Sequence, residues 1–310
     1  MLTFQPAGFG QKSAATRLGS TAYYTPVESL WPAPTGKVPI VFFHTFGGGA
    51  SAYEWSKVYP VFATRYCVIA PDLIGWGASA HPAHRYCAQD YLDNIEDFIR
   101  EISDEPVIAV ASSFTAALVA RLAAQKPELF ERLFLTCPSG FRDFGANAGR
   151  RIPEPIINAP FLDKAIYAVG AMNELAVRNF LENFLLARRD RLSPETVAAY
   201  LASASQPNAE YAALAFLRGD LYFDLAPYMT QLQVPAAIVW GEKARFTPVE
   251  TGRRLAALNP KAVKRFQVLS ETGVLPHLEQ PGVVAALLLD WLATDIPNPT
   301  DLTDSQEAPS

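Results

Sequence analysis

Short apolar runs rich in β-branched residues alternate along this chain with longer segments whose apolar residues recur every three to four positions. This alternation is typical of a mostly parallel sheet, because a helix must carry the chain back to the start of each parallel strand. Half of the 310 residues are hydrophobic, enough to cover both faces of such a sheet. The pattern predicts an α/β fold with strands at Val38–His44, Tyr66–Pro71, Val107–Ala111, Leu133–Thr136, Ala236–Trp240 and Lys264–Leu269, and helices at Asp90–Ile102, Phe114–Gln125, Pro248–Leu258 and Pro281–Ala293.

Three parts of the chain interrupt this alternation. Residues 141–224 carry helical patterns, at Phe161–Gly170, Glu174–Leu186 and Pro194–Ala204, and no buried strand, which indicates a helical insertion above the sheet. Residues 1–36 alternate weakly and predict peripheral antiparallel strands. The polar, proline-containing end predicts disorder. We therefore expect a core of residues 1–140 and 225–296, a helical cap of residues 141–224 and a disordered tail of residues 297–310.

Charge and cysteine usage exclude several classes of function. A net charge of -5 provides no basic surface for phosphates, so nucleic acid is not an expected partner. Cys67, Cys87 and Cys137 are odd in number and widely spaced, which predicts reduced, buried thiols instead of a disulfide framework. No cluster of ligating residues indicates a metal or a cofactor. Without a secretory leader or an apolar run of membrane-spanning length, a cytoplasmic protein is expected. No pattern specifies an oligomeric state.

Five motifs lie at the ends of the predicted strands or near the end of the chain. They are His44-Thr-Phe-Gly-Gly-Gly49, Pro71-Asp-Leu-Ile-Gly-Trp-Gly-Ala-Ser79, Ala111-Ser-Ser-Phe-Thr115, Trp240-Gly-Glu242 and Pro276-His-Leu-Glu-Gln-Pro281. In this order they resemble the α/β-hydrolase superfamily of serine hydrolases and esterases, over residues 38–140 and 225–293. The resemblance implies an eight-stranded, mostly parallel sheet flanked by helices, with a helical cap.

The resemblance also implies roles for three residues. Ser113 stands at the strand-to-helix turn where this family places its nucleophile, with Ala111 and Thr115 at positions where glycine is usual. The backbone N–H groups of Phe46 and Phe114 would then hold the oxyanion. From the residues alone, Ser112 and Ser113 can also be explained as helix caps, and the glycines after His44 as a plain turn.

Two family positions hold apolar residues here. Ala244 stands where the family has its catalytic acid, and Val274 stands where it has its catalytic histidine. A serine hydroxyl needs a base within hydrogen-bond reach to become a good nucleophile. The remaining candidates are His277 for the base, with His44 expected to orient its loop and His81 and His84 expected in a polar turn. Glu242 and Asp143 are candidates for the acid, whereas Asp72 and Glu279 are expected to bind backbone groups.

These features support two classes of function. The resemblance implies hydrolysis of an ester or related acyl bond, and the apolar insertion indicates a small hydrophobic molecule as the substrate. The replaced acid and histidine favour a protein that kept the fold for binding a ligand or partner without catalysis. A third interpretation is lyase-type or oxygenation chemistry on the same fold.

Overall fold

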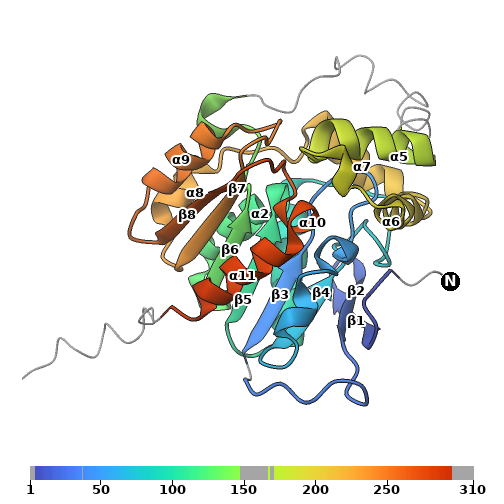
Figure 1. Cartoon of the computed structure of the whole chain (residues 1–310), viewed down its shortest axis with the longest axis horizontal. Coiled ribbons are helices and arrows are strands. Elements are labelled where there is room, and N and C mark those ends of the chain that lie inside the picture. The colour runs from blue at the N-terminus through green and yellow to red at the C-terminus, as the bar shows by residue number, and fades with distance from the viewer. Residues whose placement is uncertain (1–3, 37, 147–166, 168–170, 295–310) are drawn as a thin grey trace, which may run out of the picture.

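Eight strands form a single sheet in the order β1-β2-β4-β3-β5-β6-β7-β8 (Figure 1). The computed structural model describes residues 4–36, 38–146, 167 and 171–294. The strands are β1 (Phe9–Thr16), β2 (Gly19–Pro26), β3 (Pro39–Phe43), β4 (Cys67–Pro71), β5 (Val107–Ser112), β6 (Phe130–Thr136), β7 (Ala236–Gly241) and β8 (Val263–Leu269). The predicted α/β fold with its eight-stranded sheet is confirmed.

The sheet is antiparallel at one side and parallel elsewhere. β1 pairs with β2 along its whole length, and β2 pairs antiparallel with β4. From β4 through β3, β5, β6 and β7 to β8 every pairing is parallel. The parallel register sets Phe43 beside Ala111, Ser112 beside Thr136, and Thr136 beside Val239. The carboxyl ends of these strands therefore reach one common edge of the sheet, where the loops that follow them meet.

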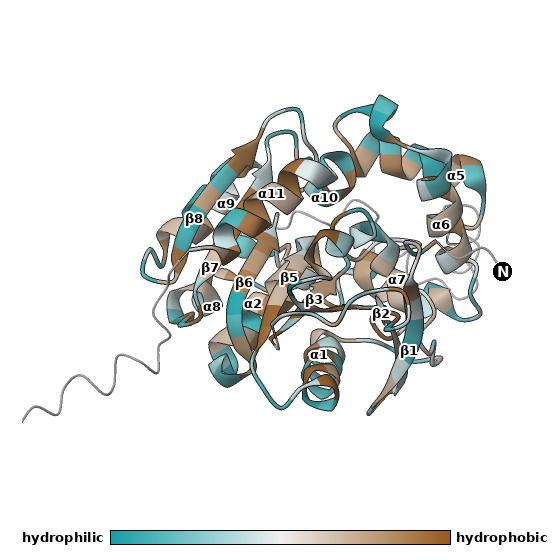
Figure 2. Cartoon of the chain, turned by 60° about the horizontal axis from the view of Figure 1, so that its bottom comes forward, coloured by the Kyte–Doolittle hydropathy of each residue, from teal (hydrophilic) through white to brown (hydrophobic). Residues whose placement is uncertain are grey.

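Helices cover both faces of the sheet. One face packs against α1 (Ala88–Ile102), α2 (Ser113–Gln125), α8 (Ala226–Gln231) and α9 (Val249–Ala257), and the other against two 3₁₀ turns (Ala52–Trp55 and Tyr59–Phe62) and α11 (Pro281–Leu292). Every residue of β3, β5 and β7 is buried, as expected for strands covered on both faces. Figure 2 shows α1 on one side of the sheet, with α10 (Pro276–Glu279) and α11 on the other.

The insertion contributes helices beyond the common edge. These are α5 (Glu174–Phe180), a π turn (Leu181–Leu185), a 3₁₀ turn (Arg189–Arg191), α6 (Pro194–Ala204) and α7 (Ala209–Arg218), and α5, α6 and α7 gather at the upper right of Figure 1. Two of the predicted helical segments thus form helix, while Phe161–Gly170 lies outside the described residues except for Tyr167. The division into core, cap and tail stays a prediction.

Helix α6 is hydrogen-bonded to the core at several points. The Ser203 hydroxyl donates to the Ala50 carbonyl at 3.0 Å and accepts from the Gly77 N–H at 3.1 Å. The Thr196 and Tyr53 hydroxyls are 3.1 Å apart. Because these groups are buried, the bonds satisfy polar atoms that would otherwise be costly. Helix α6 is therefore held firmly against the core, beside the loops at the common edge of the sheet.

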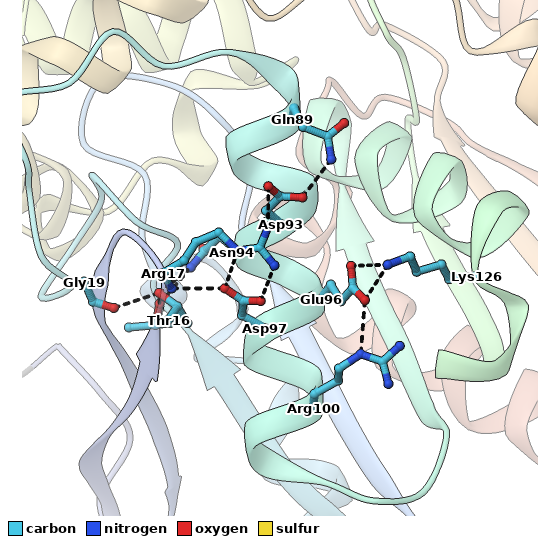
Figure 3. A network of polar contacts seen from close by, with 11 residues as sticks. Thr16, Arg17, Gly19, Gln89, Asp93, Asn94, Glu96, Asp97, Arg100 and Lys126 are labelled. Carbon is cyan, nitrogen blue, oxygen red and sulfur yellow. Dashed lines mark hydrogen bonds and ion pairs between the residues drawn. The ribbon is translucent and has the colours of Figure 1, made fainter.

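A polar network ties the β1–β2 turn to α1 (Figure 3). Arg17 binds Asp93 and Asp97 at 2.6 Å each, while the buried Asn94 donates to the hydroxyls of Thr16 and Thr21. Asn94 also accepts from the backbone N–H of Ile74 at 3.2 Å, so it fastens two loops to the helix.

The cysteine expectation is correct in one respect and wrong in another. Cys67, Cys87 and Cys137 are free, but only Cys137 is buried, while Cys67 is half-buried and Cys87 is exposed. Cys87 precedes the first turn of α1, where the chain enters the helix from solvent. Its surroundings are set by the position of that helix start, which the spacing of cysteines does not encode. Within the described part of the chain, no helix is both long and apolar enough to span a membrane.

Candidate functional site

Ser113 is the first residue of α2, directly after β5. Its φ is 53°, in the left-handed region that non-glycine residues rarely adopt, and its side chain is almost buried. The turn connects the last residue of a strand to a helix without any intervening loop, which forces this backbone conformation. The strand-to-helix turn expected at Ser113 is confirmed.

Helix capping does not account for the two serines. Ser112 is the N-cap residue of α2, yet its side chain makes no capping hydrogen bond. The Ser112 hydroxyl, like that of Thr115 in the first turn, is buried without a hydrogen-bond partner among the described residues. A capping serine would accept a backbone N–H of the first helical turn. The N–H groups of this turn are therefore left to other acceptors.

The His44–Phe46 segment is held by its own histidine. The buried Nε2 atom of His44 accepts from the Leu73 N–H at 2.9 Å, so Nδ1 carries the ring proton and donates to the Thr45 carbonyl at 2.6 Å. The Phe46 N–H, in contrast, has no acceptor among the described residues. The rings of Phe46 and Phe114 meet edge to face, with centroids 5.1 Å apart. The two predicted oxyanion residues are thus neighbours, and His44 orients its loop as expected.

The two apolar replacements pack in the core, although Ala244 also lines a partly open cavity with Glu242 and Pro248. Ala244 and Val274 are buried and belong to the same hydrophobic cluster as Phe46 and Phe114. The Val274 N–H donates to the Leu185 carbonyl at 2.9 Å, which binds this loop to the insertion. Neither position carries a group that can exchange a proton.

Cys137 lies between the loops that hold these two positions. Its Sγ accepts from the Gly241 N–H at 3.3 Å and approaches the Gly273 carbonyl at 3.9 Å. Complete burial raises the pKa of this thiol to about 12, so it stays neutral near pH 7. Cys137 therefore joins the two loops without supplying a base.

The surroundings of His277 do not suit a general base. Its side chain is fully buried, stacks on Trp55 with ring centroids 3.9 Å apart, and makes no hydrogen bond to another described residue. Its Nε2 lies 3.6 Å from a Glu54 oxygen, beyond hydrogen-bond length. Burial lowers the pKa of His277, an effect that Glu54 partly opposes. We therefore interpret His277 as a core residue.

The other two histidines, His81 and His84, lie in the segment that precedes α1. His84 lies 3.1 Å from the Asp90 carboxylate on the molecular surface. Burial lowers the pKa of His81, whose Nε2 has no partner among the described residues. No hydrogen bond joins any of the four histidines to Ser113 in the described structure.

The carboxylate candidates bind backbone and surface groups. Asp143 accepts from the Ser139 hydroxyl at 2.6 Å and from the Leu225 N–H at 2.9 Å, and burial raises its pKa. Glu242 is partly exposed and accepts from the Ser270 hydroxyl and the Glu271 N–H at 3.1 Å each; these bonds, led by the backbone one, lower its pKa. Neither meets a histidine. No group of three His, Cys, Asp or Glu that could hold a metal occurs among the described residues.

Asp72 and Glu279 behave as expected of loop-binding carboxylates. Asp72 accepts from the N–H groups of Ala52 and Ala78 at 2.7 Å each. Glu279 accepts from the N–H of Gly273, beside Val274, and at 3.0 Å from the N–H of Ala187 in the insertion. The Glu279 side chain therefore clamps the loop that lacks the histidine to the insertion.

Comparisons with known proteins agree with this architecture. The model of the alpha/beta hydrolase family matches residues 40–287. The chain belongs to that family. The alpha/beta hydrolase chain is 26% identical to the uncharacterized hydrolase YugF of Bacillus subtilis over 261 residues, which are 83% of this chain and 90% of the relative.

Two further similar proteins are named for the reactions that they catalyse. A 2-hydroxy-6-oxo-6-(2'-aminophenyl)hexa-2,4-dienoic acid hydrolase of Metapseudomonas resinovorans is 25% identical over 225 residues, 71% of this chain and 72% of the relative. The crystal structure of the carboxylesterase CesB from Bacillus subtilis aligns with a TM-score of 0.72 at 17% identity, over 94% of each chain. At that identity, the structural likeness shows the fold alone.

Sequence reasoning missed one charged residue at this edge of the alpha/beta hydrolase. Glu54 is completely buried beside the His44–Phe46 segment. A carboxylate within the largely apolar run Ala52-Tyr-Glu-Trp55 was the available signal, because buried charges are rare unless they are paired. Its partner Tyr200 has no such signal, since it comes from a helix 146 residues later in the chain.

Proposed function

We propose that this alpha/beta hydrolase cleaves an ester or related acyl bond in a small hydrophobic substrate, with Ser113 as the nucleophile. The observation that carries the proposal is the φ of 53° at Ser113. Holding a non-glycine residue in this region costs on the order of 1–3 kcal/mol and is expected where the strain aims a side chain for function. The hydroxyl at this turn would stand at the common edge of the sheet.

Two N–H groups are suited to the developing oxyanion. The Phe46 N–H has no acceptor among the described residues, and Phe114 lies in the first turn of α2, where N–H groups have no intrahelical acceptor. The partial positive charge of the helix N-terminus adds to their effect. We therefore place the oxyanion between Phe46 and Phe114.

Aromatic rings around these residues support a hydrophobic substrate. Phe216, from helix α7 of the insertion, contacts Phe46 and Phe114 with centroids 5.8 Å and 5.5 Å away. Phe141 and Tyr222 stack on each other beside Phe216. Such a surface favours an apolar acyl group over a charged one.

Catalysis by this arrangement should be slow. With Ala244 and Val274 in place of the acid and histidine, the Ser113 proton must pass to water as the Oγ–carbonyl bond forms. The ester C–O bond then breaks, and the leaving alcohol takes its proton from water. A second water must attack the acyl group on Ser113, which releases the carboxylic acid and returns a proton to the Ser113 oxygen. Oxyanion stabilisation and binding without a working triad still accelerate such reactions by about 10³–10⁴-fold over water. We expect Ser113 to accelerate ester hydrolysis by this factor over water, and the rate to rise with pH.

A fluorophosphonate probe tests the proposal, because it bonds to a nucleophilic serine while the oxyanion donors hold its phosphoryl oxygen. Intact-mass analysis should show a single adduct that is lost in Ser113→Ala and retained in Ser112→Ala, the matched neighbouring serine. Hydrolysis of a short-chain aryl ester should follow the same pattern. Equal labelling of wild type and Ser113→Ala, or no labelling, would instead favour binding without catalysis.

A further inference from the structure

Glu54 places a fully buried carboxylate directly behind the oxyanion loop, defined as His44–Gly49. One of its oxygens accepts from the Thr45 N–H at 2.8 Å, and the other accepts from the Tyr200 hydroxyl at 2.6 Å. Both oxygens accept from donors, which suits an ionised carboxylate. Charge-assisted bonds of this kind are stronger than neutral ones and define geometry well.

Both backbone polar groups of Thr45 are hydrogen-bonded to buried side chains. Glu54 holds its N–H, and the Nδ1–H of His44 holds its carbonyl at 2.6 Å. The Thr45 carbonyl belongs to the same peptide unit as the Phe46 N–H, and in a trans peptide the two groups point in opposite directions. Fixing the carbonyl and the preceding N–H therefore fixes the direction of the unbonded Phe46 N–H.

The second oxygen of Glu54 connects the oxyanion loop to the insertion. Tyr200 lies on helix α6, and its backbone carbonyl packs against Gly49 at the end of the oxyanion loop. A Cβ added to Gly49 would come within 2.2 Å of that carbonyl, and its φ of 94° also requires glycine. Helix α6 thus contacts the loop both directly and through Glu54.

Neighbouring groups hold Glu54 in this position. The indole of Trp55 donates to the Phe43 carbonyl at 2.9 Å, which fixes the short helical turn that carries Glu54. His277 stacks on Trp55 and brings its Nε2 to 3.6 Å from the Glu54 carboxylate. The carboxylate therefore has little freedom to move away from Thr45.

We propose that Glu54 is a positioning residue that aims the Phe46 N–H at the oxyanion and couples this donor to helix α6 through Tyr200. The proposal rests on the function proposed above, because it assigns Glu54 to the same site. Glu54 acts through the loop and does not touch the reacting atoms.

Two substitutions and one control separate positioning from simple stabilisation. Glu54→Met keeps the shape and removes both acceptors. Glu54→Gln keeps an oxygen for the Thr45 N–H and presents its amide to the Tyr200 hydroxyl. The control is Asn259→Leu, which removes a half-buried side chain that binds the carbonyls of Met229 and Leu232 and the N–H of Ala262, with no contact to the oxyanion loop. Each protein is assayed for Ser113-dependent aryl ester hydrolysis, per folded molecule.

The expected result is a selective loss of kcat. Glu54→Met should lower kcat by about 10–100-fold, part of the 10²–10³-fold lost when an oxyanion donor is deleted, with KM changed less than about threefold. Glu54→Gln should stay within about threefold of wild type. Asn259→Leu should lose stability alone. If Glu54→Met keeps the wild-type kcat, the proposal is wrong. Should Glu54→Met fail to fold, Glu54→Asp, which withdraws the carboxylate by one methylene, carries the same expectation.

Amide hydrogen exchange at Thr45 distinguishes this proposal from the proposed hydrolysis. The Thr45 N–H should exchange faster in Glu54→Met than in wild type, and at the wild-type rate in Asn259→Leu. No Ser113-dependent turnover in wild type would refute the proposed function, and the catalytic part of this inference with it. Unchanged Thr45 exchange in Glu54→Met would refute loop positioning by Glu54, whatever the activity of the wild type.

Discussion

The oxyanion side and the acid–histidine side of this alpha/beta hydrolase lie at the same edge of the sheet but differ in chemistry. On the oxyanion side, Ser113 keeps a strained backbone, and the Phe46 N–H has no acceptor among the described residues. On the acid–histidine side, Ala244 and Val274 are buried in an apolar cluster, and the Val274 N–H is already bonded to Leu185. One side has donors left for a ligand, and the other has no group at Ala244 or Val274 that can exchange a proton.

The difference shows that the two sides can diverge separately. An oxyanion hole needs only backbone N–H groups and the contacts that aim them, so it tolerates wide changes of side chain elsewhere. Proton transfer needs specific side chains, and two substitutions remove it. Strain at Ser113 would be a cost without benefit if the oxyanion side had also lost its role. Three predictions challenge this comparison, from the largest expected effect to the smallest.

Restoring both side chains on the acid–histidine side should produce the largest change. Ala244→Asp combined with Val274→His should raise kcat for a short-chain aryl ester by about 10²–10⁴-fold, because a positioned triad supplies far more than the oxyanion hole alone. The measurement is steady-state hydrolysis by the folded double variant, compared with wild type.

Single variants provide the controls for this gain. Ala244→Asp alone should gain nothing, since an acid without a histidine has no ring to orient. Adding Ser113→Ala to the double variant should remove the gain. A folded double variant with wild-type activity would show that the oxyanion side has diverged as well, which contradicts the comparison.

A substitution at Glu279 tests whether this side chain holds the loop of Val274 against the insertion. Glu279→Gln leaves one acceptor for the N–H groups of Gly273 and Ala187 and removes the carboxylate that pairs with Arg191. Leaving buried donors unpaired should cost about 2–3 kcal/mol of unfolding free energy in urea. The matched control is Glu242→Gln, which changes an exposed carboxylate in the neighbouring loop and should leave the urea midpoint unchanged. Equal midpoints for all three proteins would mean that Glu279 does not clamp the loop.

Much of this architecture could be predicted from the sequence, because its causes are local. The apolar runs that became β3, β5 and β7 are buried on both faces, and such strands are visible as continuous hydrophobic segments. The turn at Ser113 was predictable because a strand pattern runs directly into a helical one. Glu279 was expected to bind backbone groups, and it does so.

The unpredicted features depend on contacts between distant segments. The link from Glu54 to Tyr200 joins residues 146 positions apart, and nothing near either residue indicates the other. Likewise, the exposure of Cys87 follows from where α1 lies against the sheet. The role of His277 was open in the sequence because its distance from the family's histidine position is short along the chain. Its stacking on Trp55 required the folded structure.

The smallest expected effect concerns His277, whose behaviour separates a buried core residue from a replacement base. Burial lowers its pKa in the folded protein below the ordinary value of 6.5, so the unfolded chain binds a proton that the folded protein resists. Stability should therefore fall as pH drops below about 6.5, and each pKa unit of lowering contributes up to about 1.4 kcal/mol. His277→Phe, which keeps a ring against Trp55, should reduce this loss between pH 7.5 and 5.5 in urea unfolding.

The same variant should keep its per-molecule hydrolysis rate, because the His277 ring packs behind Trp55 and has no hydrogen bond to Ser113. His81, whose pKa burial also lowers, should still contribute to the pH dependence that remains. A base acting on Ser113 would behave differently: its removal would cut the rate as deeply as Ser113→Ala and abolish a titration near neutral pH. If well-folded His277→Phe shows that collapse, proton transfer has moved to His277, and the loss at Ala244 and Val274 has been compensated.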